Sequence, residues 1–185
     1  MNAYVRALQK LVQSRSQDAT LDWDVVYDQT LPKVYNFFRY RLADSALAED
    51  LTATTFERAW KARHRFQPHR AEPGTWLLGI ARNVWREHLR EQRSRPPLSL
   101  ETMEHLPADN DPEHLLQAQD ERERLQTLLA RLPEREQELI ALKYGAGISN
   151  RQIAAMTGLS ESNVGTILHR TVRKLRRLWE DESYE

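Results

Sequence analysis

Apolar residues recur along most of the chain at intervals of three and four, which is the spacing of one face of an α-helix. This pattern predicts helices within residues 31–42, 45–60 and 75–90, and further helices beyond residue 113. Alternation of apolar and polar residues, which indicates a strand, forms no convincing run, and only six of the 185 residues are glycine. The sequence therefore predicts an all-α protein.

The helical spacing lapses between Pro96 and Pro112, a stretch that holds four of the eight prolines and is typical of an irregular connection. Lys and Arg are absent from Pro96 to Glu121. The acidic stretch either shields the Arg-rich helices beside it or is only a solubilising spacer. We expect two small helical domains joined by a flexible linker: an N-terminal extension 1–20, a first domain 21–95, the linker 96–112 and a second domain 113–185.

The helix expected over residues 75–90 has two contrasting faces. A core stripe at helical spacing contains Leu77, Ile80, Ala81, Val84 and His88. The opposite face is cationic and contains Arg82, Asn83, Arg86, Arg90 and Arg93. Arg65, in the loop before the helix, adds a further positive charge near this face. Trp76 and Trp85 are either core residues or platforms on which unpaired bases stack.

The segment "ISNRQIAAMTGLSESNVGTILHR", residues 148–170, predicts two helices around the turn Thr157-Gly158-Leu159, with the helix-turn-helix pattern. Ser149 and Gln152 have the spacing of a capping box, and Ser160 is a natural N-cap for the second helix. Small or apolar residues stand where the two helices would meet, namely Ile153, Ala154, Gly158, Leu159, Val164 and Ile167.

The free face of the second hairpin helix predicts DNA binding. Val164 to Trp179 contains five Lys or Arg residues and no acid, which favours a polyanionic partner such as a DNA major groove. The alternative is an ordinary helical hairpin with a solvated basic face. The predicted reading stripe comprises Ser162, Thr166, His169, Arg170, Arg173 and Arg177.

Composition narrows the remaining possibilities. The chain has 27 basic and 27 acidic residues, so its overall charge argues for no partner, and it has no cysteine with which to form a disulfide or a zinc site. No apolar run is long enough to span a membrane, and Met1 to Thr20 lacks the apolar core of a signal peptide. We therefore expect a cytoplasmic protein without direct membrane insertion.

We expect neither an enzyme nor a cofactor. The chain lacks a phosphate-binding glycine loop and a Cys nucleophile, and the acidic residues of 134–138 are most simply a solvated helix face. His64 and His69 have no third candidate ligand nearby, so no metal site is predicted.

Three blocks of the sequence follow one another in an order that is more specific than any one of them: "AEDLTATTFERAW", "TWLLGIARNVWREHLR" and, after the linker, "LPEREQELIALKYGAGISNRQIAAMTGLSESNVGTILHR". Together they resemble an extracytoplasmic-function (ECF) sigma factor, the small two-domain class of bacterial RNA polymerase initiation subunits. The resemblance covers residues 25–95 and 131–179. It implies that the first domain binds the clamp of the largest polymerase subunit and melts the −10 promoter element, and that the hairpin reads the −35 element.

The resemblance also implies roles for single residues. Asn83 lies where the family captures a flipped base of the non-template strand, and the single strand would be held by Arg65, Arg82, Arg86 and Arg90. The clamp-binding surface would comprise Asp50, Ala53, Thr54 and Glu57. The family usually has Gln and an acid at the positions of Ala53 and Thr54, and often basic residues at those of Gly165 and Ile167.

The partners implied by the resemblance are core RNA polymerase, promoter DNA in duplex and single-stranded form, and an anti-sigma factor. The alternative is a transcription regulator that binds an operator through the hairpin alone. That reading explains the hairpin but leaves the cationic face from Arg82 to Arg93 without a role.

Overall fold

In the computed structural model, the parts of the chain that the structure describes, residues 22–94 and 112–181, contain helices and no strand, so the predicted all-α class is confirmed. The predicted N-terminal extension and all but the last residue of the predicted linker lie outside the described residues. The elements are α2 (Trp23–Arg39), α3 (Ser45–Ala62), the 3-10 helix η1 (Arg63–Arg65), α4 (Pro73–Ser94), α5 (Pro112–Ala130), α6 (Glu134–Ile140), the π-turn η2 (Ala141–Gly145), α7 (Asn150–Thr157) and α8 (Glu161–Asp181).

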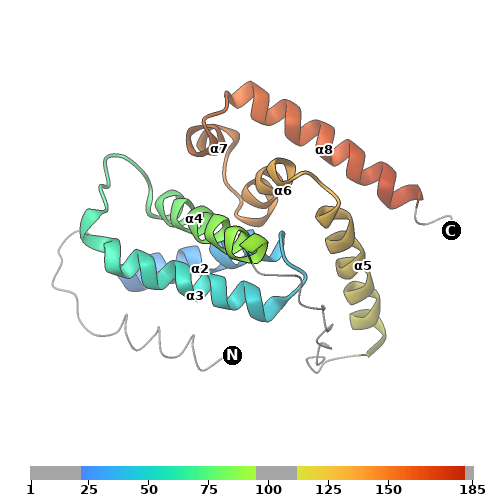
Figure 1. Ribbon diagram of the computed structural model, residues 1–185, viewed down its shortest axis with the longest axis horizontal. Coiled ribbons are helices and arrows are strands. Elements are labelled where there is room, and N and C mark those ends of the chain that lie inside the picture. The colour runs from blue at the N-terminus through green and yellow to red at the C-terminus, as the bar shows by residue number, and fades with distance from the viewer. Residues whose placement is uncertain (1–21, 95–111, 182–185) are drawn as a thin grey trace.

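The helices form two groups (Figure 1). We call α2 to α4 the first module and α5 to α8 the second module. Within the first module each of the three α-helices packs against the other two. This layout agrees with the expected pair of small helical domains.

Aromatic rings dominate the contacts inside the first module. The ring of Trp23 lies edge-on to those of Trp60 and Trp76, with centroids 5.7 and 6.1 Å away, and the rings of Tyr27 and Phe56 are 4.8 Å apart. Such aromatic pairs add about 0.5–1.5 kcal/mol each beyond the burial of apolar area. Because the rings come from all three helices, they fix how α2, α3 and α4 cross.

α2 begins at Trp23, well before the residues on which the apolar pattern centred. Asp22 caps it, because its carboxylate accepts hydrogen bonds from the backbone N–H groups two and three positions on, at 3.1 and 3.3 Å. The helix continues through Pro32, which lacks an N–H and normally weakens a helix. Burial of Trp23, Val26 and Tyr27 before the proline explains why the helix extends so far.

The second module is built around α6 and η2, whose apolar side chains are buried, including Leu139 and Leu142. In η2 the backbone N–H of Ala146 donates to the carbonyl of Ala141 at 2.9 Å, five residues back, so the turn is wider than an α-helical one. α8 lies across the top of the module in Figure 1, beside α7 and above α6.

The two modules pack directly against each other, and their buried apolar side chains belong to one continuous cluster. The main contact joins α2 of the first module to η2 of the second. On one flank of this contact, the Gln126 side chain in α5 donates to the carbonyl of Arg39 at the end of α2. The apolar spacing predicted the helices but gave no sign of this shared core.

Candidate nucleic-acid interface

The hairpin formed by α7 and α8 has the predicted caps. Ser149 and Gln152 bond reciprocally at the start of α7, with the Gln152 N–H donating to Ser149 Oγ at 3.2 Å and the Ser149 N–H donating to Gln152 Oε1 at 2.9 Å. Gly158 ends α7 at φ 73°, a left-handed conformation that suits glycine. Ser160 Oγ accepts from the N–H of Asn163 at 3.2 Å and caps α8. The predicted helix boundaries are therefore confirmed.

α8 separates a buried face from an exposed one. Val164, Leu168 and Thr171 are buried against the rest of the second module. Every residue of the predicted reading stripe is exposed, namely Ser162, Thr166, His169, Arg170, Arg173 and Arg177. The Thr166 hydroxyl donates to the Ser162 carbonyl at 3.0 Å, so its oxygen remains available as an acceptor.

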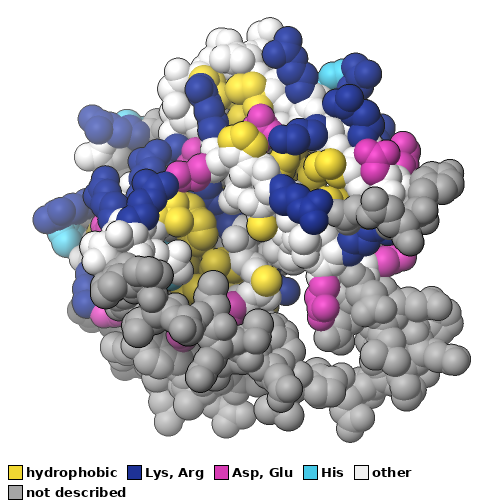
Figure 2. All heavy atoms as spheres, turned by 45° about the vertical axis from the view of Figure 1, so that its right-hand side comes forward, with side chains coloured by type: hydrophobic (Ala, Val, Ile, Leu, Met, Phe, Trp, Pro, Cys, Tyr) yellow, Lys and Arg dark blue, Asp and Glu magenta, His cyan; other side chains and the backbone are white. Residues whose placement is uncertain are grey.

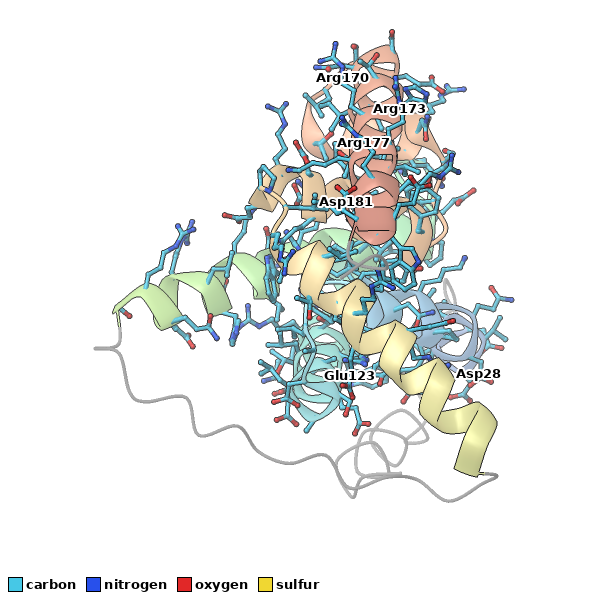
Figure 3. All side chains as sticks on the ribbon, turned by 90° about the vertical axis from the view of Figure 1, so that its right-hand side faces the viewer. Asp28, Glu123, Arg170, Arg173, Arg177 and Asp181 are labelled. Atoms are coloured by element: carbon cyan, nitrogen blue, oxygen red, sulfur yellow. The ribbon has the colours of Figure 1, made fainter. Side chains whose placement is uncertain are left out.

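The arginines of the stripe follow one another along one side of α8. Figure 3 shows Arg170, Arg173 and Arg177 in a row, with Asp181 at the C-terminal end of the same side. Lys and Arg side chains gather over the upper part of the molecule in Figure 2, where α8 lies. A protruding helix with a cationic free side has the form that enters a DNA major groove.

α4 presents part of the predicted single-strand surface. Asn83, Arg86 and Arg90 are exposed on it, and Arg65 is exposed in η1 just before the loop that leads to α4. Phe66 anchors that loop, because its ring lies 5.3 Å from the ring of Trp76 at the start of α4. This contact holds the loop in a fixed position next to the start of α4.

Arg82 does not lie on this exposed surface, so its predicted placement is wrong. Its side chain is buried against the second module, with the whole residue 7% exposed. Nε donates to Glu138 Oε1 at 2.7 Å, and Nη1 donates to the carbonyl of Met156. Leu78, Arg82 and Trp85 are spaced four and three residues apart and form a second buried stripe on α4. This spacing was the sequence signal that could have predicted the burial of Arg82.

The choice between core and stacking platform is settled for one of the two tryptophans. Trp85 is buried, at 5% exposure, and belongs to the core. Trp76 is half-buried between Trp23 and Phe66. For Trp76 the stacking role stays a prediction.

The predicted polymerase-binding residues lie on α3 and differ in exposure. Asp50 is exposed, while Thr54 and Glu57 are half-buried. Glu57 also pairs with Lys61 one turn on, at 2.5 Å. Ala53 is buried, at 4% exposure, and its prediction as a surface position is wrong, because α3 packs against both α2 and α4 and therefore buries a broad face.

Arg41, which the sequence pattern did not single out, lies where the two modules meet. Its Nη2 donates to the carbonyl of Glu134 at 3.4 Å, while its buried Nε and Nη1 have no hydrogen-bond acceptor among the described residues. Burial lowers the pKa of Arg41 to about 10, and the nearby carboxylates of Glu138 and Glu134 oppose that change. The guanidinium is therefore still charged at neutral pH.

The described residues also bear on metal binding and on membrane insertion. No three His, Cys, Asp or Glu side chains among residues 22–94 and 121–181 come together in a way that could hold a metal ion. None of the helices in these ranges is both long enough and apolar enough to cross a membrane.

Comparison with known proteins places both modules in one family. The family model "Sigma-70 region 2" matches residues 26–95, and "Sigma-70, region 4" matches residues 122–175. The ECF RNA polymerase sigma factor BldN of Streptomyces coelicolor is 34% identical over 161 residues, which are 85% of this chain and 60% of that relative. The ECF RNA polymerase sigma factor RpoE of Cereibacter sphaeroides is 32% identical over 155 residues, 83% of this chain and 82% of the relative.

A solved structure has the same fold. The sigma factor RpoE from Bartonella quintana, crystallised with the anti-sigma factor NepR, superposes with a TM-score of 0.65 at 22% identity, over 86% of this chain and 97% of that one. The fold alone does not establish the family. The two sigma regions in this order and the 32% identity with the Cereibacter relative do establish it. The chain belongs to the ECF family of RNA polymerase sigma factors, and it directs transcription initiation.

Proposed function

We propose that α8 reads the −35 element of the promoter from the major groove. The observation that carries this proposal is the division of α8 into a buried face around Val164 and Leu168 and an exposed polar and cationic stripe. Side chains near the start of such a helix meet base edges, and cationic residues farther along meet phosphates. The capped hairpin supplies the rigidity that this positioning needs.

The first module acts on the −10 element in this proposal. Strand opening costs a few kcal/mol for each unstacked base, and without ATP it must be offset by binding the opened strand. Asn83 supplies amide hydrogen-bonding groups for an unpaired base, and Arg86, Arg90 and Arg65 supply cations for its backbone. Arg82 joins this set only if it leaves its contacts with Glu138 and Met156.

The clamp of the largest polymerase subunit is the proposed partner of α3. Asp50 is the exposed acid on this helix, and Thr54 and Glu57 follow it on the accessible side. Ala53 has no part in the contact, because its side chain is buried. An anti-sigma factor is a further proposed partner, supported by the complex in which the Bartonella sigma factor was crystallised.

Run-off transcription tests this function. Core RNA polymerase of the organism that encodes the chain is mixed with the purified protein and a promoter fragment from the neighbouring genome. The proposal expects a discrete transcript only when both proteins are present. Tight binding of the protein alone to duplex operator DNA, without a transcript, would favour a stand-alone regulator instead.

A further inference from the structure

Gly79 lies in the interior of α4, where packing within the protein does not require a glycine. α4 runs unbroken from Pro73 to Ser94, and glycine is, after proline, the residue least suited to a helix interior. A Cβ atom added at Gly79 would meet no atom within 4 Å among the described residues. Alanine would therefore fit at this position and would favour the helix, so neither packing nor helix stability accounts for the glycine.

The other five glycines of the chain differ from Gly79 in this respect. Gly147 and Gly158 have φ of 68° and 73°, a conformation that residues with a side chain rarely adopt. At the remaining three positions, an added Cβ would lie 3.6 Å or less from an atom of another helix, namely at Gly74, Gly145 and Gly165. Gly79 alone has neither a positive φ nor a described residue close to an added Cβ.

The residues around Gly79 carry groups that can bind unpaired DNA. Trp76, Asn83 and Arg86 are three, four and seven positions away, a spacing that places them on the same side of α4. Asn83 and Arg86 are exposed, and Trp76 is half-buried. An aromatic ring and an amide suit a nucleobase, and a guanidinium suits a phosphate. Gly79 therefore provides bare helix backbone in the middle of a surface made of such groups.

We propose that a nucleobase of the opened strand lies directly against the α4 backbone at Gly79, between the Trp76 ring and the Asn83 amide. Close approach of a ligand to the backbone is one of the conditions that require glycine. A side chain at this position would hold the base away from the helix. The inference rests on the proposed role of α4 in binding the −10 element, and it adds a residue that acts through its lack of a side chain.

Two substitutions fill this position to different extents. Gly79→Ala adds one methyl group and Gly79→Leu adds a larger side chain, and both should raise the melting temperature of the full chain by about 2–4 °C. The matched control Gly74→Ala makes the same change in the first turn of α4, where the added methyl group faces Thr30 inside the first module. Gln92→Leu places the larger side chain at an exposed position farther along α4.

Binding is measured for the holoenzyme on a fork-junction promoter fragment with an unpaired non-template strand, and on the matching full duplex. On the fork junction, Gly79→Ala should bind about threefold and Gly79→Leu about tenfold more weakly than the parent, because the base is displaced from its contact. Both controls should match the parent, and affinity for the full duplex should be the same in all variants. A purely structural role of Gly79 does not combine a higher melting temperature with weaker binding to the fork junction.

Removal of single bases tests whether a base makes this contact. An abasic nucleotide is placed in turn at each unpaired position of the fork junction. At the position that meets Gly79, the parent and Gly79→Leu should bind equally, because the base that the leucine displaces is absent. At every other position the difference of about tenfold should remain.

The outcomes separate this inference from the proposed function. Equal affinity of the parent and Gly79→Leu for the intact fork junction would overturn the inference, and so would a difference that persists at every abasic position. A lower melting temperature of Gly79→Ala would also contradict it, because the protein itself would then occupy the space beside Gly79. A parent holoenzyme that binds the fork junction no better than the full duplex would instead contradict the proposed function of α4, and the inference with it.

Discussion

The guanidinium of Arg41 lies over the ring of Trp85, with its central carbon 4.6 Å from the ring centre. Arg41 ends the turn after α2, and Trp85 lies in α4, so the pair joins two elements of the first module. The same arginine donates to the Glu134 carbonyl of the second module. One side chain thus links the aromatic core to the boundary between modules.

This position predicts the effect of removing Arg41. Arg41→Ala should lower the free energy of unfolding by about 1–2 kcal/mol, because a desolvated cation–π contact and the packing of the side-chain stem are lost. Arg41→Met keeps apolar contact with the ring and removes a buried charge, so its loss should be less than half as large. Urea unfolding followed by circular dichroism measures both. An equal loss in the two variants would show that charge, rather than contact with the ring, is what matters.

Local chemistry explains why the hairpin could be predicted from sequence. The Ser149–Gln152 box and Gly158 at the end of α7 depend on residues within a few positions of one another. A capping box and a left-handed glycine at a helix end can both be recognised from residues a few positions apart in the sequence. The exposed stripe of α8 followed in the same way from helical spacing.

The contact between modules could not be predicted, because it depends on residues far apart in the chain. Arg82 and Glu138 are 56 positions apart, and the stripe that Arg82 shares with Leu78 and Trp85 does not identify the partner against which it is buried. Ala53 was misplaced for a related reason. Spacing identifies one buried face of α3, whereas two neighbouring helices bury a wider one.

The α7 cap gives a second prediction. Ser149→Ala should lower the free energy of unfolding by about 0.5–2 kcal/mol, because it removes the hydroxyl that accepts the Gln152 N–H. Ser149→Asp, which can still cap, should lose much less. Thermal unfolding of the three proteins compares them. A Ser149→Asp variant as unstable as Ser149→Ala would mean that the hydroxyl donor to Gln152 Oε1 is what counts.

Promoter melting gives a third prediction. Asn83→Ala should leave polymerase binding nearly unchanged and reduce open-complex formation several-fold, because a base-binding group acts only after the base has left the stack. Permanganate reactivity of thymines in the bubble measures the open complex. Gln92→Ala, at an exposed position farther along α4, is the control and should behave as wild type. Normal thymine reactivity with Asn83→Ala would remove Asn83 from the melting surface.

The last prediction separates base reading from phosphate binding along α8. Arg177 lies seven residues beyond Arg170, or about 10 Å farther from the Ser160 cap at 1.5 Å per residue. Arg170→Ala should cost about 1–3 kcal/mol on the preferred −35 sequence and much less on scrambled DNA, since a bidentate contact with guanine needs the right base. Arg177→Ala should weaken binding to both DNAs alike and reduce the salt slope by roughly 0.9, as expected for one lost phosphate contact. Holoenzyme affinity for both DNAs across a salt series measures these effects. Equal weakening by Arg170→Ala would make that residue a phosphate contact, and altered sequence preference with Arg177→Ala would mean that α8 enters the groove in another orientation.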